Sequence, residues 1–225
     1  QRQMCIRDRA YSVFKDIFLT DKLTGLLSSN AYNLLLEEVR QEEIESKDRI
    51  IRLFIGRSDI KPPFFLVMMD ISMLKEVNDI YGHGMGDLLL KRFGQELRSI
   101  IRRTDLAFRI GGDEFLALLR VTDIDKALRI AERIGNRFYS LVEELGVETH
   151  NGLPETGLNM GLVEGKSADK ESLKKQIETA DKLMYISKKR YKDQWDYKQE
   201  ISIDKELEKR AKIVVTPFYS IAFLE

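Results

Sequence analysis

The segment Gly111-Gly112-Asp113-Glu114 places two carboxylates directly after two glycines, between two short apolar runs. The runs 106–110 and 115–119 are typical of strands, and Gly-Gly between such runs predicts a tight hairpin turn. Glycine lets the backbone bend and lets a ligand approach without meeting a Cβ. Carboxylates at the tip are suited to bridging a divalent cation to phosphate oxygens, although a solvated acidic turn would have the same sequence.

Asp70 is a third candidate carboxylate, and it follows the apolar run 64–69. This run is long enough for a buried central strand and too short for a buried helix. In the topology predicted below, the hairpin tip lies beside the carboxyl end of that strand, so Asp70 should meet Asp113 and Glu114 at one sheet edge. Carboxylates this close repel one another unless a cation lies between them, and oxygen ligands select Mg²⁺ or Mn²⁺. Two-metal nucleotidyl transfer uses a site of this kind, whereas a simple helix N-cap is the alternative for Asp70.

The elements that must position these residues follow from hydrophobic periodicity. Apolar residues recur at helical spacing in the longer segments, and short apolar runs predict the strands. Helices are expected with apolar faces spanning 32–39 and 89–101 and over 73–80, 123–145 and 171–191, and strands over 64–69, 106–110, 115–119 and 157–163. A glycine-rich turn is expected over 81–87, and a loop or a short helix with a linker over 41–63. The resulting βααββαβ order predicts an α/β (α+β) sandwich of the ferredoxin-like or palm type, with a central sheet containing antiparallel strands and flanked by helices.

Composition limits the classes of function. The chain has 225 residues, room for one domain with extensions, and equal totals of 37 basic and 37 acidic residues. A formal net charge of zero argues against bulk electrostatic binding to nucleic acid or to an anionic membrane. Cys5 is the single cysteine, so no intrachain disulfide forms, which fits a reducing cytoplasm. No apolar run approaches the roughly 20 residues of a membrane helix. A cytoplasmic protein with no nucleic-acid partner and no membrane segment is expected.

Three regions are expected along the chain. Residues 1–20 form an N-terminal segment: 1–9 resemble vector-derived sequence, and 10–19 have helical spacing suited to self-pairing or to packing on the domain. Residues 21–193 form the main domain. Residues 194–225 form an extension with a charged helix and an apolar end, which could pack on the domain, pair at a sheet edge, or begin a further domain.

A series of motifs resembles the GGDEF family, the diguanylate cyclases. The matching segments occur in family order and at family-like spacing at 21–26, 70–79, 81–87, 111–115 and 180–188. The resemblance implies condensation of two GTP to cyclic di-GMP with release of two pyrophosphates, dependent on Mg²⁺ or Mn²⁺. Because one domain binds one GTP and the product has two phosphodiester bonds, it also implies a homodimer.

The resemblance implies a role for each matched residue. The metal ligands would be Asp70, the backbone carbonyl of Ile71, Asp113 and Glu114, and the catalytic residues Asp113, Glu114 and Lys75. Asp113 or Glu114 would assist deprotonation of the attacking 3′-hydroxyl. Asn78 and Asp87 would bind the guanine edge, His83 and Leu74 would line the nucleotide pocket, and Lys75, Lys188 and Lys192 would neutralise phosphates. Arg102 and Asp105 match an inhibitory site for the product, where an arginine can clamp phosphate or stack on guanine.

Several of these residues are also compatible with purely structural roles. Lys188 could lie on a solvated helix face, Asn78 could simply end a helix, and Arg102 with Asp105 could form a surface ion pair. A degenerate module that senses GTP or cyclic di-GMP without turnover is the alternative function, and a cyclase with another base preference is a third.

The chain departs from the family pattern at several positions. Ser72 stands where the family usually has a second Asp, Leu74 replaces Phe, Ser28-Ser29 replaces Asn-Arg, Asn159-Met160-Gly161 replaces Ser-x-Gly, and Tyr191-Lys192 replaces Gly-Arg. We expect Asp21 to lose an ion-pair partner and Leu74 to alter the wall of the guanine pocket. No implied metal ligand is lost, so activity should persist, and Asp87 favours guanine over a mixed guanine/adenine product.

Overall fold

The computed structural model describes residues 18–36, 60–147, 156–193, 204–216 and 219–224, without the side chains of 191–193. The predicted helix over 10–19 therefore falls almost entirely outside the described residues. The helices are α2 (Ser29–Leu36), α4 (Leu74–Tyr81), α5 (His83–Ile100), α6 (Ile124–Glu144), α7 (Lys170–Asp193) and α8 (Lys205–Arg210). The strands are β1 (Phe64–Ile71), β2 (Leu106–Arg109), β3 (Glu114–Leu119), β4 (Leu158–Gly165), β5 (Lys212–Val215) and β6 (Tyr219–Phe223).

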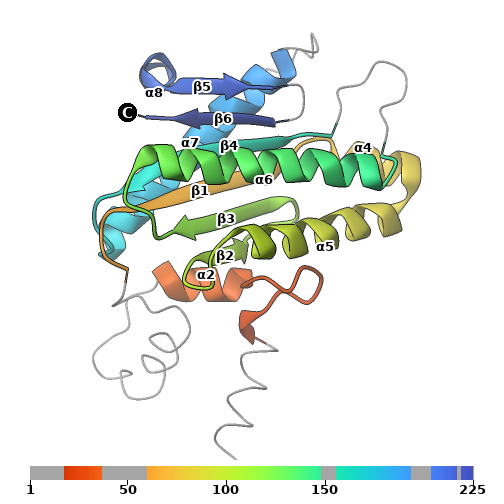
Figure 1. The fold of residues 1–225 in the computed structure, drawn as a ribbon, viewed down its shortest axis with the longest axis horizontal. Helices are drawn as coiled ribbons and strands as arrows, with labels where there is room; N and C mark the ends of the chain where they lie inside the picture. Colours follow the sequence, from red (N-terminus) through yellow and green to blue (C-terminus); the bar gives the residue numbers. More distant parts are fainter. Residues whose placement is uncertain (1–17, 37–59, 148–155, 194–203, 217–218, 225) are drawn as a thin grey trace, which may run out of the picture.

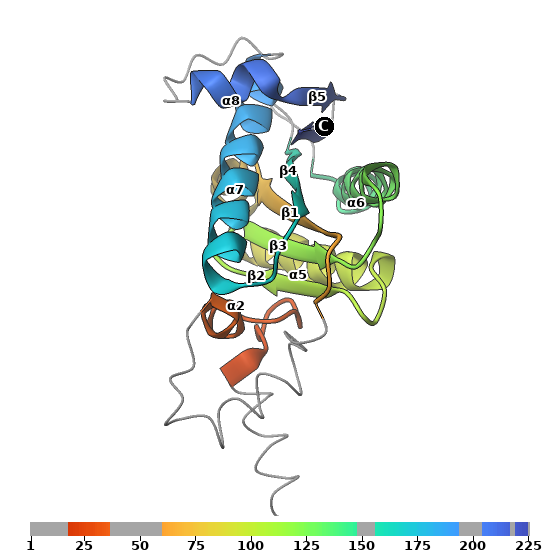
Figure 2. The ribbon, with the colours of Figure 1, turned by 90° about the vertical axis from the view of Figure 1, so that its left-hand side faces the viewer.

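One sheet joins all the described strands in the order β2-β3-β1-β4-β6-β5. Strand β1 lies in the middle and pairs antiparallel with β3 and β4, whereas β4 and β6 run parallel. Figure 1 shows α5 and α6 in front of this sheet, and the edge-on view of Figure 2 shows α7 on the opposite face. The predicted α/β sandwich with a βααββαβ core is thus confirmed.

Every residue of β1 is buried because helices cover both faces of the sheet. Phe65, Val67 and Met69 belong to the core under α5 and α6. Phe64, Leu66 and Met68 belong to a second core under α7. Since side chains alternate along a strand, Asp70 continues the second series and faces α7.

Two local expectations were wrong. The stretch 81–87 does not form a turn throughout, because α5 begins at His83 and only Gly82 takes a positive φ, of 84°. The alternative role for Asp70, a helix N-cap, is excluded because Asp70 lies inside β1 and the residue before α4 is Met73. Strand β1 continues to Ile71, beyond the expected end of the run.

The C-terminal extension contributes to the same sheet in its described part. Strand β6 pairs with β4, and β5 pairs with β6 at the edge. Two of the three possibilities for the apolar end are therefore observed together: it pairs at a sheet edge, and Tyr219, Ile221 and Phe223 pack in the core of the domain. Among the described helices, no segment has the length and apolar character needed to span a membrane.

Candidate active site

Four polar side chains form one row across the α7 face of the sheet. Glu114 of β3 lies opposite Asp70 of β1, and Asp70 lies opposite Asn159 of β4. Asn159 in turn lies opposite Ser220 of β6. Directly opposite residues on paired strands project from the same face, so the row runs unbroken over four strands. The sequence prediction that Asp70 and Glu114 meet is confirmed by this register.

The hairpin tip is attached to the end of β1 by its backbone. The N–H of Ile71 donates to the carbonyl of Asp113 at 3.1 Å, and the N–H of Ile110 donates to the carbonyl of Glu114 at 3.0 Å. A Cβ on Gly111 would lie 2.5 Å from Glu114 Oε2, so the Glu114 carboxylate folds back over this glycine. The first glycine of the pair thus makes room for the carboxylate, and both acidic residues lie beside Asp70.

Lys188 of α7 pairs with Asp70. Its Nζ lies 2.8 Å from Oδ1 and 2.9 Å from Oδ2 of the carboxylate. The Asp70 side chain is 6% exposed and that of Lys188 is 21% exposed, so the pair is largely shielded from water. A partly buried carboxylate needs such a partner, since an unpaired buried charge is strongly unfavourable.

The pKa values around this pair reflect crowded negative charge. Burial raises the pKa of Asp70; the Lys188 charge opposes this shift and the Asp113 charge adds to it. Burial also raises the pKa of Glu114, and the charges of Asp113 and Asp181 add to the effect. The pKa of Asp181, on α7, is raised by burial and by Asp70. Carboxylates in this state bind a proton or a cation readily.

The donor set fits a hard divalent cation in its chemistry. Asp70, Asp113 and Glu114 supply carboxylate oxygens at one sheet edge, and the carbonyl of Ile71 is adjacent in the chain. Within the described ranges, no group of three or more His, Cys, Asp or Glu side chains is already arranged as a metal site. The Lys188 ammonium is the cation beside Asp70 in this conformation.

The implied base-binding residues lie at the junction of α4 and α5. A Cβ on Gly86 would collide with Asn78 Oδ1, so the Asn78 amide packs directly on the first turn of α5, next to Asp87. Asp87 and His83 are exposed there, and so is Lys75 on α4. Leu74 is partly buried against the main core. The structure therefore brings Asn78 to the segment that carries Asp87.

A family model described as "Diguanylate cyclase, GGDEF domain" matches residues 18–194. The chain belongs to the GGDEF domain family. Diguanylate cyclase A of Treponema denticola is 35% identical over 128 residues, which are 57% of this chain and 33% of that protein. Diguanylate cyclase DgcS of Shewanella oneidensis is 36% identical over 123 residues, which are 55% of this chain and 38% of that protein. The chain thus spans between 33% and 38% of the length of these relatives.

A solved structure of a family member supports the fold. The diguanylate cyclase SiaD of Pseudomonas aeruginosa, solved in complex with its activator SiaC, is 27% identical with a TM-score of 0.53. The match covers 81% of this chain and 62% of that one.

The Arg-x-x-Asp motif of this GGDEF domain has an evident structural role. Asp105 is 1% exposed, and its two carboxylate oxygens accept the backbone N–H groups of Arg102 and Arg120, each at 2.9 Å. It thereby fastens the α5–β2 connection to the end of β3. Arg102 itself is exposed. The prediction of a product site at Arg102 and Asp105 is not tested by this geometry.

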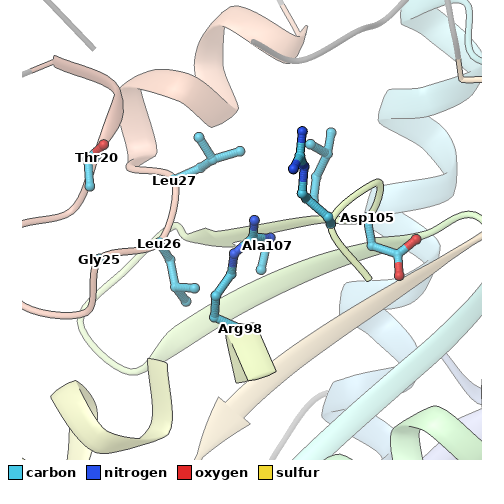
Figure 3. A pocket seen from close by; sticks show the side chains of 9 residues that line it. Thr20, Gly25, Leu26, Leu27, Arg98, Asp105 and Ala107 are labelled. Atoms are coloured by element: carbon cyan, nitrogen blue, oxygen red, sulfur yellow. The ribbon is translucent and has the colours of Figure 1, made fainter. Parts of the chain in front are cut away.

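A cavity of about 310 Å³ lies beside that connection (Figure 3). Arg98 and Arg103 line it together with Asp105 and residues of the 20–27 turn, while Arg102 does not.

The expected loss of an ion-pair partner at Asp21 is wrong. Arg109 Nη1 lies 3.4 Å from both carboxylate oxygens of Asp21, and Arg109 Nη2 donates to the carbonyl of Gly112 at 2.7 Å. Burial works against the charge of Asp21, but hydrogen bonds from Thr24 and the Arg109 charge lower its pKa. Arg109 therefore links the Asp21 turn to the tip of the GGDEF hairpin.

Sequence reasoning missed several residues of the GGDEF site. Asp181 lies within the matched closing helix, but nothing in the local pattern indicated that it shares the environment of Asp70. Asn159 and Ser72 were noted as separate departures from the family, whereas the structure places them in contact. The side chain of Lys192 lies outside the described residues, so its predicted phosphate contact stays a prediction.

Proposed function

We propose that this GGDEF domain is a diguanylate cyclase that condenses two GTP to cyclic di-GMP across a homodimer. In each half-reaction a 3′-oxygen bonds to the α-phosphorus of the other GTP, the bond to pyrophosphate breaks, and the hydroxyl proton leaves. The observation that carries the proposal is the placement of Asp70 and Glu114 in one row, with Asp113 joined by its backbone to Ile71.

Asp70, Asp113, Glu114 and the Ile71 carbonyl would hold Mg²⁺ or Mn²⁺. When bound, the metal polarises the phosphate and lowers the cost of forming an alkoxide. Glu114 is suited to accept the 3′-hydroxyl proton because its pKa is raised, above all by burial. Lys188 is proposed to neutralise phosphate charge, and Lys75 and Lys192 are proposed to assist it.

Asn78 and Asp87 are proposed to orient the guanine. A carboxylate accepts from both N1–H and N2–H₂ of guanine, and adenine offers no such pair of donors. His83 and Leu74 are proposed to border the same pocket. Two subunits are needed because each contributes one nucleotide to a product with two phosphodiester bonds.

The direct test is to incubate the protein with Mg²⁺ and either GTP or ATP and to identify products by mass. Cyclic di-GMP from GTP alone is expected, with none in Asp113→Ala. Asp125→Ala, which removes an exposed carboxylate from α6, is the matched control and should keep full activity. A cyclic product from ATP would favour a cyclase with another base preference. GTP binding without turnover would favour a module that senses the nucleotide without catalysis. Full activity in Asp113→Ala would reject the metal site.

Inhibition by cyclic di-GMP through Arg102 and Asp105 is proposed as part of the same function. Because Asp105 also holds the α5–β2 connection, Arg102→Ala is the variant that separates binding from folding. If product inhibition is weaker in Arg102→Ala and unchanged in Arg98→Ala, the result would support an inhibitory site at Arg102 and Asp105. The reverse result would shift the inhibitory site to the cavity lined by Arg98 and Arg103.

A further inference from the structure

Ser72, Asn159, Ser187 and Ser220 form a buried polar cluster beside the candidate site. Their exposures are 2%, 0%, 0% and 0%. They lie between the sheet and α7, next to a small apolar cluster in which Ala222 packs against Leu183 and Ile186. Buried polar groups are unfavourable unless they are hydrogen-bonded, so the partners of each member matter.

The cluster is internally paired. Ser220 Oγ donates to Asn159 Oδ1 at 3.1 Å and shares the same proton with the Ser187 carbonyl at 3.0 Å. Ser187 Oγ lies 2.5 Å from Ser220 Oγ and also accepts the backbone N–H of Met160 at 3.3 Å. At the other end, Asn159 Nδ2 donates to Ser72 Oγ at 2.5 Å.

These bonds determine how the Asn159 amide is turned. An Asn side chain has an oxygen that only accepts and a nitrogen that only donates, and the two ends differ little in shape. The Ser220 hydroxyl holds the oxygen on the β6 side. The nitrogen is then directed toward β1, where Asp70 lies directly opposite Asn159. The reversed amide would instead bring its oxygen toward the Asp70 carboxylate.

Two of the departures from the family pattern, at positions 72 and 159, belong to this same cluster. Ser72 replaces an Asp and Asn159 replaces a Ser, and the two replacements touch each other through a hydrogen bond. Ser220, the residue that bonds to the Asn159 oxygen, lies in β6, beyond the 18–194 segment that the family model matches. Figure 1 shows β6 alongside β4, between β4 and the edge strand β5.

We propose that Ser220 is a positioning residue: it orients the Asn159 amide toward Asp70 and so holds this carboxylate in place for the divalent cation. The kinetic test of this inference rests on the proposed function. It assigns to the C-terminal extension a part in the catalytic site, through a chain of contacts from β6 to β4 to β1.

The kinetic test compares Ser220→Ala with wild type in the full chain. The Mg²⁺ concentration for half-maximal cyclic di-GMP formation should rise about tenfold, the usual scale for losing an outer partner of a metal ligand. Thr216→Val is the matched control, because Thr216 Oγ1 donates to the Tyr219 carbonyl at 2.9 Å, within the β5–β6 hairpin itself. An equal shift in Thr216→Val would mean that hairpin stability alone is responsible and would overturn the proposal.

A double-mutant cycle tests the route. Ser220→Ala should have no further effect on the Mg²⁺ requirement in an Asn159→Ala background, since both changes remove the same oriented donor. Additive effects would contradict action through Asn159.

A second readout does not depend on activity. The side-chain ¹H–¹⁵N signals of Asn159 in the nucleotide-free protein should shift and broaden in Ser220→Ala and stay unchanged in Thr216→Val. Unchanged Asn159 signals in Ser220→Ala would overturn the proposal even if the protein is an active cyclase. If wild type makes no cyclic di-GMP, the proposed function fails while these signals still decide whether Ser220 orients Asn159.

Discussion

Lys188 Nζ contacts both carboxylate oxygens of Asp70, at 2.8 and 2.9 Å, across 118 residues of sequence. The ammonium thus lies against the two oxygens with which Asp70 is proposed to bind a metal ion. This pair explains how a strand that is buried along its whole length can contain a charged residue. In the proposed function, Asp70 would hold the metal and Lys188 would neutralise phosphate charge, so the two residues of this pair have neighbouring roles.

Replacing Lys188 with Met should destabilise the metal-free protein. The change leaves Asp70 buried and unpaired, a loss of about 3 kcal/mol, or roughly 6–12 °C in Tm for a domain of this size. Mg²⁺ should restore part of the loss because it supplies the missing positive charge. Calorimetry with EDTA and with Mg²⁺ measures both effects. Lys189→Met is the control: Lys189 lies 3.6 Å from Glu208 on the surface, and its loss should cost less than about 1 kcal/mol.

Gly86→Ala should weaken GTP binding without disrupting the fold. The new Cβ would collide with Asn78 Oδ1 and displace the amide from its position beside Asp87. We expect KM for GTP to rise roughly tenfold, the value of one hydrogen bond to the base. Gly84→Ala is the matched control in the same turn of α5, because a Cβ there meets nothing within 4 Å. Equal KM values for the two variants would argue against guanine binding by Asn78.

Glu114→Gln should change the pH dependence of stability in EDTA. The folded protein raises the pKa of Glu114, so this group favours the native state at low pH, and its contribution declines as pH rises from the unfolded to the folded pKa. The Tm of the variant relative to wild type should therefore increase with pH over that window. Asp123→Asn should show the opposite trend, because hydrogen bonds from Lys126 lower the pKa of Asp123. The Asp123 trend falls below the ordinary pKa of this group, 3.8, whereas the Glu114 trend falls above the ordinary pKa of Glu114, 4.5, so calorimetric scans from about pH 2 to pH 8 cover both. If Glu114→Gln and wild type have parallel Tm curves, the raised pKa of Glu114 is refuted.

Arg109→Ala should loosen the GGDEF hairpin. The side chain donates to the Gly112 carbonyl in an exposed hydrogen bond and pairs with Asp21 in a partly buried one. A loss of about 2 kcal/mol in unfolding free energy is expected, with a fall in kcat that exceeds the change in KM. Arg92→Ala removes the exposed pair with Glu144 at 3.3 Å and should cost less than about 1 kcal/mol. If Arg109→Ala leaves kcat unchanged, the position of the hairpin does not depend on the contacts that Arg109 makes.

The local sequence pattern was sufficient to predict most of the helices and strands. The buried strand at 64–69, the hairpin around Gly111 and the amphipathic helix beginning after Asp123 were predicted because each has a clear period and clear end signals. The first turn of α5 was missed because its glycines favour a turn locally, while the Asn78 contact at Gly86 requires a residue without a Cβ inside the helix.

The sequence alone determined the family and the order of elements, since motif spacing and strand alternation are local properties, and the topology predicted from that order placed Asp70 beside Glu114. Only the tertiary structure decided which groups share the site with them. The Lys188–Asp70 pair, the Arg109–Asp21 link and the Asn159–Ser220 contact depend on how α7 docks and on the register between distant strands. Those relations arise from packing of the whole core, and no short segment contains the residues that make them.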